Sequence, residues 1–297
     1  MTEETADKKE EKSLKTDSWR IYGWGISDVG MRREHNEDSY LLLPQYNAFV
    51  VADGMGGHAG GEMASGVSVR TIQAFVEAHK DTIAPDAQYD GPVDQSPVAR
   101  LASDAVREAC RAVYRKSQEI KELENMGTTT VLSVYHQQYL FIGHVGDSRA
   151  YLIRDGHIAQ LTDDHSLVNE QLKAGLITEQ QAQTSRFKNI ITRSVGFEED
   201  VDVDVIVVET RPGDAVLLCS DGLSGLVSDK EINDIVNENF LRRAPELLVE
   251  LANERGGDDN ITIVLNYISD GSEPAWDHAS DDPPEAVIGG AAFNAGL

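Results

Sequence analysis

Residues 49–58 read Phe49-Val50-Val51-Ala52-Asp53-Gly54-Met55-Gly56-Gly57-His58. The first four residues are apolar and predict a buried strand, and Asp53 stands at its end. Glycine directly after the carboxylate indicates that the backbone turns here and that a neighbouring group approaches closely. The glycine also leaves the adjacent carbonyl group accessible, so this strand end is the first candidate for a binding site.

Three further acidic segments lie far from this one in the chain, and each also stands at the end of a predicted strand. They are Asn36-Glu37-Asp38 before 39–43, Ser220-Asp221-Gly222 after 216–219, and Asp258-Asp259-Asn260 before 261–264. Any single acid of this kind can simply cap a helix or form a turn. If all four strand ends meet in space, however, they build an all-oxygen site suited to hard divalent cations.

The composition restricts the classes of partner. The chain has 297 residues with 51 acidic and 26 basic ones, and its net charge of −25 argues against binding to nucleic acids or to anionic membranes. A simpler role of this charge is to keep the protein soluble. Cys110 and Cys219 form no disulfide framework, and no secretory signal or membrane-spanning run is present, so we expect a cytoplasmic protein.

The hydrophobic pattern predicts two pairs of helices separated by strands. Apolar residues recur at helical spacing in 61–80, 98–123, 231–239 and 245–254. Short apolar runs predict strands at 19–27, 39–43, 48–52, 128–135, 139–145, 149–154, 157–161, 203–208, 215–219 and 261–268. Asp155-Gly156 is typical of a two-residue hairpin turn. The economical arrangement is of the α+β class: two central antiparallel sheets packed together, with a helix pair outside each.

The ends of the chain differ from its centre. Residues 1–17 are charged without apolar periodicity, and 269–297 are acidic and then rich in glycine and alanine, so we expect both segments to be disordered. One catalytic domain is expected over 18–268. Within it, 162–200 is polar and predicted to be helical in pieces, with a capping-box pattern at Thr178–Gln181; a second such pattern stands at Ser228–Glu231.

The acidic segments, taken in order, resemble a known family. Residues 27–38, Ser-Asp-Val-Gly-Met-Arg-Arg-Glu-His-Asn-Glu-Asp, are similar to the opening motif of protein phosphatase 2C, the metal-dependent serine/threonine phosphatases. Later motifs of that family are resembled, in order, by 53–57, Gly127-Thr128-Thr129, Gly146-Asp147-Ser148-Arg149, 220–222 and 259–262. Residues 162–196 resemble the flap of its bacterial branch. The resemblance covers about residues 19–268, and the ordered set is far more specific than any single motif.

The resemblance implies an αββα sandwich and assigns roles to the acids. Asp53 is expected to bridge two Mg²⁺ or Mn²⁺ ions, Gly54 to offer its carbonyl oxygen to one, and Asp221 and Asp259 to hold the other. Glu37 and Asp38 would act through water. Asp147, with Asp221, matches a third and weaker metal position, although a turn residue is the alternative at this place. The implied reaction is direct attack on the phosphomonoester by a hydroxide that bridges the two cations.

Two further residues are candidates for contact with substrate. Arg33 matches the phosphate-binding arginine of the family, and its planar fork suits phosphoryl oxygens, whereas a plain surface charge is the alternative. Met55 stands where many eukaryotic members have histidine, and His58, three residues later, is either the general acid or a hydrogen-bonded turn residue. His35 is interpreted as structural, and His165 receives no catalytic role.

The resulting prediction is a bacterial phosphatase acting on phosphoserine and phosphothreonine in targets of a serine/threonine kinase, and we expect it to be monomeric. The alternative is a catalytically silent module of the same fold that binds phosphorylated proteins. Because all four acidic segments are intact, the sequence favours the enzyme. The flap either selects the phosphoprotein or is a surface insertion, and its cations Arg186 and Lys188 are candidates for contact with an acidic or phosphorylated partner.

Overall fold

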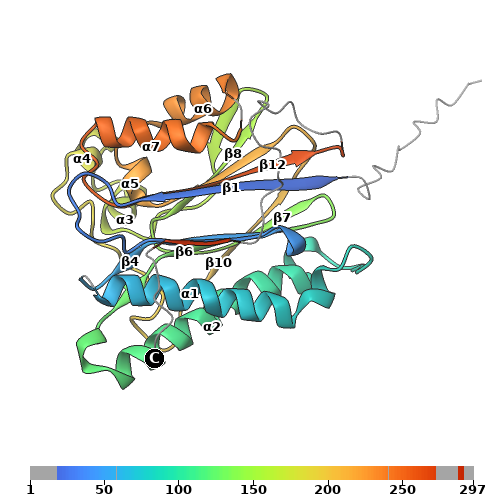
Figure 1. Ribbon diagram of the computed structural model, residues 1–297, viewed down its shortest axis with the longest axis horizontal. Coiled ribbons are helices and arrows are strands. Elements are labelled where there is room, and N and C mark those ends of the chain that lie inside the picture. Colours follow the sequence, from blue (N-terminus) through green and yellow to red (C-terminus); the bar gives the residue numbers. More distant parts are fainter. Residues whose placement is uncertain (1–18, 58, 240, 272–286, 291–297) are drawn as a thin grey trace, which may run out of the picture.

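The computed structural model describes residues 19–57, 59–239, 241–271 and 287–290. Two antiparallel β-sheets are packed face to face, and helices cover the outer face of each sheet (Figure 1). The predicted α+β class and the αββα order of layers are therefore confirmed.

The two sheets contain strands from both halves of the chain. The first has the order β1 (Arg20–Asp28), β12 (Ile261–Ser269), β11 (Ala215–Cys219), β8 (Arg149–Arg154) and β9 (His157–Gln160). The second has the order β10 (Asp204–Glu209), β7 (Tyr139–Val145), β6 (Thr130–His136), β3 (Ala48–Ala52), β2 (Ser39–Leu43) and β13 (Val287–Gly290). A short ladder joins β4 (Gly54–Met55) to β5 (Gly127–Thr128). The first and last long strands, β1 and β12, are neighbours along nine residue pairs, which brings the two ends of the domain together.

Each sheet is covered by its own helices. The long helices α1 (Ala59–Ala78) and α2 (Pro97–Glu119) pack on the second sheet, and α6 (Asp229–Glu238) and α7 (Ala244–Glu254) pack on the first (Figure 1). The short helices are α3 (Leu167–Lys173) and α4 (Glu179–Gln183) in the flap and α5 (Asp221–Ser224) after β11. Single 3₁₀ turns span Pro44–Tyr46, Lys80–Ile83, Val93–Gln95 and Lys121–Leu123.

Three apolar layers hold these elements together. Successive side chains of a strand face opposite sides, so one strand serves two layers. Val50 of β3 packs toward α1 and α2, whereas its neighbours Phe49 and Val51 pack between the sheets. Leu217 and Leu265 belong to the third layer, beneath α6 and α7. The central strands β3, β6, β7 and β11 are buried on both faces, which is why they read as continuous apolar runs in the sequence.

Sequence patterns that act over a few neighbouring residues predicted the boundaries of most helices and strands to within a few residues. Ser96 accepts a hydrogen bond from the Ala99 amide and Pro97 occupies the first turn, so α2 begins one residue before the predicted start. Both predicted capping boxes are present, at α4 and α6. The Asp155-Gly156 turn joins β8 and β9, and both of its residues have positive φ.

The terminal segments lie largely outside the described residues, namely 1–18, 272–286 and 291–297. Within the predicted tail, Val287–Gly290 form the edge strand β13, which pairs with β2. These four residues are too few to show a strand pattern in the sequence. They form a strand because β2 offers an open sheet edge with which they can pair. No helix in the described part of the chain is long and apolar enough to cross a lipid bilayer.

Candidate active site

Carboxylates from five separate strand ends gather at one edge of the sandwich. Asp53 follows β3, Asp147 follows β7, Asp221 follows β11, Asp259 precedes β12, and Glu37-Asp38 precede β2. Except for Asp38, all of these residues line a single cavity of about 650 Å³, together with Arg33 and Gly54. Asp38 lies beneath it and interacts electrostatically with the others. The structure thus brings together the acidic segments that the sequence analysis singled out.

Asp53 is held by the Gly127-Thr128-Thr129 segment. The Thr129 hydroxyl accepts a hydrogen bond from the Asp53 amide at 2.9 Å, and the Asp53 carbonyl oxygen accepts from the Thr129 amide and the Thr128 hydroxyl, each at 2.8 Å. The Asp53 backbone is therefore paired on both sides. Its half-buried side chain is left to face the cavity.

Gly54 has no room for a side chain. A Cβ atom at this position would lie 2.1 Å from the carbonyl oxygen of Gly61 and 2.5 Å from that of Glu37. The Gly54 amide donates to the same Glu37 oxygen. The glycine predicted from the turn is thus required by the close packing of α1 and the Glu37 backbone against β4.

Asp38 is the most deeply buried of these acids, with 1% of its surface exposed. One carboxylate oxygen accepts a hydrogen bond from the Ser220 hydroxyl at 2.7 Å, and the other has no hydrogen-bond partner among the described residues. Burial raises the pKa of Asp38 to about 7, against the opposing effect of the neighbouring Thr262 and Ser220 hydroxyl groups. An unpaired buried carboxylate oxygen is costly, so it calls for a ligand such as an ordered water molecule or a cation.

The remaining carboxylates show the same electrostatic conflict. Burial, followed by repulsion from Asp38, Asp221, Asp147 and Asp259, raises the pKa of Asp53 well above its usual value. Burial and the charge of Asp221 raise the pKa of Asp147 to about 7, and burial and Asp259 raise that of Asp221. So many acids can be ionised together only if positive charge is added between them. The all-oxygen donor set fits Mg²⁺ or Mn²⁺.

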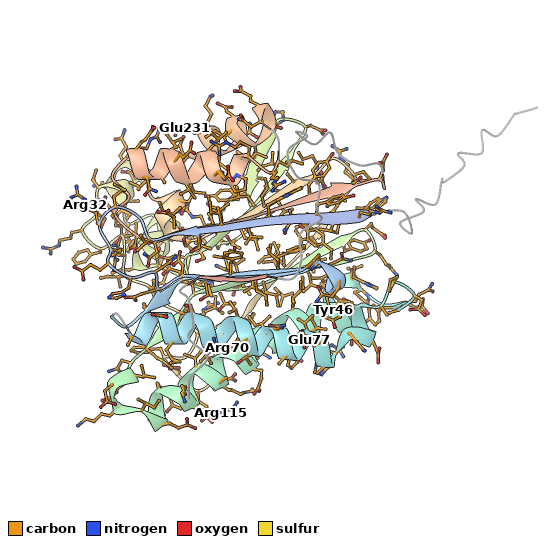
Figure 2. All side chains as sticks on the ribbon, in the orientation of Figure 1. Arg32, Tyr46, Arg70, Glu77, Arg115 and Glu231 are labelled. Carbon is orange, nitrogen blue, oxygen red and sulfur yellow. The ribbon has the colours of Figure 1, made fainter. Side chains whose placement is uncertain are left out.

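Arg33 lies at the mouth of this cavity. Its guanidinium donates to the Asp259 carboxylate at 2.7 Å, and about half of its side chain is exposed. Arg32, next to it, extends into solvent at the edge of the molecule, and its guanidinium lies 3.9 Å from the Asp258 carboxylate (Figure 2). Of the two neighbouring arginines, the structure therefore places only Arg33 against the carboxylates.

Asn260 is a residue of the site to which the sequence analysis gave no role. Its side-chain amide donates to the carbonyl oxygens of Val29 and His35, and its side-chain oxygen accepts from the Glu37 amide. One side chain thus holds the loop that carries Arg33 and Glu37 against the start of β12. The only sequence signal was an amide directly after the acid in 258–260, and its partners were more than 200 residues away.

The flap forms one wall of the cavity. Asn189, Ile191, Thr192, Arg193, Ser194 and Phe197 line it, and Val195 pairs with Thr128 through two backbone hydrogen bonds. Lys188 lines an adjoining groove of about 600 Å³ that shares Asp147, Asp221 and Asp259 with the cavity. Arg186 stacks on Phe187. The flap is thus placed to contact whatever enters, rather than standing apart on the surface.

The other candidates for chemistry do not line the cavity where the structure describes them. His58 is outside the described residues, so its predicted role stays a prediction. His35 is exposed and contributes its backbone carbonyl oxygen to Asn260. Cys110 and Cys219 are buried, free thiols away from the cavity lining, and burial raises the pKa of Cys219 to about 12. A thiolate nucleophile is therefore not offered by either cysteine.

Comparison with known proteins agrees with this site. The model of the family described as protein phosphatase 2C matches residues 31–266, which include every acid of the cavity. The chain is 35% identical over 243 residues to the serine/threonine phosphatase stp of Listeria monocytogenes, which covers 80% of this chain and 92% of that protein.

Solved structures agree as well. The serine/threonine phosphatase PstP/Ppp of Mycobacterium tuberculosis has a TM-score of 0.74 and 32% identity, covering 84% of this chain and 99% of that one. The catalytic domain of PstP in complex with two manganese ions has a TM-score of 0.72 and 32% identity, covering 84% and 99%.

Proposed function

Because this chain belongs to the protein phosphatase 2C family, we infer that it is a metal-dependent phosphatase that removes phosphate from serine and threonine side chains of proteins. The single observation that carries this inference is the convergence of Asp53, Asp147, Asp221 and Asp259 on one cavity. These residues lie on different strand ends, and a purely structural role would not explain why their charges are packed together.

The positions of the acids suggest how two cations are held. Asp53 interacts electrostatically with Asp38, Asp147, Asp221 and Asp259. In keeping with the family resemblance, Asp53 would be shared by both ions, the Gly54 carbonyl oxygen would bind one of them, and Asp221 and Asp259 would bind the other. Glu37 and Asp38 would act through water, in keeping with the unpaired Asp38 oxygen. When bound, divalent cations lower the pKa of a coordinated water molecule and offset the charge of the phosphoryl group.

The protein itself supplies orientation and charge. Arg33 is placed to donate to the phosphoryl oxygens, because its guanidinium lies beside Asp259 at the cavity mouth while half of it remains exposed. Flap residues between 189 and 197 line the same cavity and are placed to contact the bound substrate. We expect hydrolysis by direct attack of water, since neither buried cysteine can reach the substrate.

Finer assignments are proposed with this function. Asp147 contributes with Asp221 to a third, weaker cation site, since both carboxylates line the cavity and the adjoining groove. The substrates are phosphoproteins made by a serine/threonine kinase, and the enzyme acts as a monomer in the cytoplasm. The silent binding module receives no support, because every acid of the site is retained and the relatives are named as phosphatases.

One assay tests the proposal directly. Phosphate release from phosphothreonine and phosphoserine peptides should require Mn²⁺ or Mg²⁺, and phosphotyrosine peptides of the same sequence should react far more slowly. Release that does not depend on a divalent cation, or a clear preference for phosphotyrosine, would contradict it. His58→Ala measured in the same assay decides the role of His58. A loss of turnover confined to the peptides with poor leaving groups, phosphoserine and phosphothreonine, indicates that His58 is a general acid.

A further inference from the structure

Two buried histidines stack on each other next to Asp147. His144 belongs to β7 and His165 to the start of the flap, and their ring centroids are 4.8 Å apart with an angle of 28° between the planes. They are 0% and 7% exposed, and neither lines the catalytic cavity. Burying two imidazoles that do not touch the substrate is unfavourable unless their nitrogens are used for something else.

Three of the four ring nitrogens have partners, two of them on either side of Asp147, whereas Nδ1 of His144 has none among the described residues. The Gly146 amide donates to Nδ1 of His165 at 3.0 Å, and the His165 amide donates back to the Gly146 carbonyl oxygen at 2.8 Å. On the other side, Nε2 of His144 lies 3.0 Å from the Ser148 carbonyl oxygen, to which it donates. The turn that carries Asp147 is thus held at its preceding amide and at its following carbonyl.

Other residues at the start of the flap strengthen this hold. Nε and Nη2 of Arg149 donate to the Asp164 carboxylate at 2.7–3.1 Å. The Thr162 hydroxyl accepts from the Ala150 amide at 3.0 Å. The segment 162–165 therefore runs along 146–150 and binds it at several points, and Asp147 is in the middle of the bound segment.

His165 also contacts the part of the flap that forms the cavity wall. Its carbonyl oxygen accepts from the Thr192 amide at 2.9 Å, and its Nε2 lies 3.2 Å from the Asp204 carboxylate. Arg193 pairs with the same carboxylate at 2.6 Å. Because Thr192 and Arg193 line the cavity, a single residue connects the Asp147 turn with the part of the flap that faces the substrate.

His144, His165 and Asp204 are close enough to raise the question of a second metal site. Three features argue for hydrogen bonding instead. Nδ1 of His165 already accepts from Gly146, so the proton is on Nε2, facing Asp204. Asp204 is already neutralised by Arg193. Stacked rings also direct their in-plane lone pairs side by side rather than at one point between them.

We propose that His165, supported by His144, is a positioning residue that fixes the Asp147 turn and the 192–193 wall of the flap as one unit. The inference rests on the proposed function, because Asp147 is there assigned to the third cation. Its consequence is that the cation site at Asp147 and the substrate wall are formed together. Loss of the His165 contacts should therefore weaken both, while Asp53 and its Thr129 contacts remain in place.

Substitutions that each retain one of the two contacts of the His165 ring, to Gly146 or to Asp204, test this proposal. In His165→Asn the side-chain oxygen can occupy the Nδ1 position and accept from Gly146, whereas in His165→Gln the amide reaches toward Asp204 instead. His165→Ala removes both contacts. His157→Asn, at the exposed β8–β9 hairpin, is the matched control because, within the described part of the chain, the one hydrogen bond of its ring is to the Asp155 carbonyl oxygen. All variants are made in the full-length chain, and Asp147→Asn provides the reference for loss of the carboxylate.

The first readout needs no metal and no turnover. Hydrogen–deuterium exchange of peptides covering residue 146 should be close to wild type in His165→Asn and His157→Asn. In His165→Gln and His165→Ala it should be faster by about tenfold, the effect of losing one buried hydrogen bond. Equal protection in the Asn and Gln variants would overturn the proposal, even if His165→Ala fails to fold.

The second readout is Mn²⁺ binding measured by calorimetry on the metal-free protein. The weakest of the successive Mn²⁺ binding steps is identified as the one that Asp147→Asn removes. The affinity of this step should fall in the His165→Gln and His165→Ala variants only, and KM for phosphopeptides should rise in the same variants. Wild-type binding in folded His165→Gln would contradict the proposal. If wild-type protein shows no cation-dependent turnover, the proposed function fails, but the exchange experiment still decides whether His165 holds the turn.

Discussion

The Arg33 guanidinium and the Asp259 carboxylate are joined by a 2.7 Å hydrogen bond, although 226 residues separate them in the chain. Arg33 is the proposed ligand of the phosphate, and Asp259 is a proposed ligand of a cation. The contact places the two halves of the site, the binding of phosphate and the binding of metal, within one hydrogen bond of each other. It also supplies one positive charge to a cavity otherwise crowded with acids.

Arg33→Ala should chiefly raise KM for phosphopeptides, by about tenfold or more, since a hydrogen bond to a charged group contributes about 1.5–3 kcal/mol. Arg32→Ala is the control, because Arg32 is exposed and does not line the cavity. Steady-state kinetics on both variants make the comparison. If KM and kcat of Arg33→Ala stay at wild-type values, Arg33 has no part in the site.

Asp53→Asn should abolish hydrolysis of p-nitrophenyl phosphate while the fold survives, because an amide cannot replace a carboxylate that holds two cations. Asp90→Asn, on an exposed loop, should retain full activity. Turnover and thermal unfolding are measured on the same preparations. A folded Asp53→Asn with wild-type turnover would refute the bridging role of Asp53.

Removal of divalent cations should silence the enzyme. Excess EDTA is expected to stop turnover, and Mn²⁺ added beyond the chelator should restore it, since the two arginines that line the cavity, Arg33 and Arg193, are outnumbered by its carboxylates. The melting temperature should rise with Mn²⁺ concentration, because a ligand that binds only the folded state stabilises it. Turnover that survives EDTA would point to a different chemistry.

The metal-free protein should lose stability as the pH rises from about 4 to about 7. In the fold, Asp38 and Asp147 keep their protons up to a pKa of about 7, whereas in the unfolded chain they release them near pH 4. The folded state therefore binds more protons in this window, and its stability falls as they are released.

Asp53→Asn separates this effect from other titrations. The variant relieves repulsion only where the carboxylates are charged, so without metal its melting temperature should exceed that of wild type at pH 7.5 and equal it at pH 4. The difference at pH 7.5 should be on the order of 5 °C, about 1–2 kcal/mol for a domain of this size. A lower melting temperature at pH 7.5 would show that the acids do not repel each other.

Gly54→Ala should destabilise the protein by about 1–3 kcal/mol and impair metal binding, because the added methyl group would overlap the carbonyl oxygens of Gly61 and Glu37. Gly60→Ala is the matched control: it lies in the adjacent helix α1, where the nearest atom to its Cβ is 3.4 Å away. Thermal unfolding of both variants compares them. Equal stability would mean that Gly54 is not closely packed.

Much of the fold could be predicted because its signals are local. Apolar runs marked the strands, helical spacing marked α1 and α2, and Thr178, Ser228 and Asp155-Gly156 marked helix starts and a turn. Each of these signals acts through neighbouring residues in the chain. The edge strand β13 was missed because four residues carry no pattern of their own, and they pair only where β2 leaves an open edge.

The site could be predicted as a set of residue types but not as an arrangement. Asp53, Asp221, Asp259 and Arg33 were identified from their setting and from motif order. The roles of Asn260 and of the His144–His165 pair were not, since their partners are distant backbone groups.

By itself, the sequence determined where strands end in acids, where the backbone turns, and which ionic chemistry those acids suit. Only the tertiary structure decided that the acids share one cavity, that Asp38 is sealed beneath it, and that the flap is attached to the Asp147 turn. The physical reason is that backbone preferences and burial patterns act over a few residues. The electric field inside the cavity, in contrast, depends on the distances between the carboxylates. These distances are set only after β1 has paired with β12 and the two sheets have packed together.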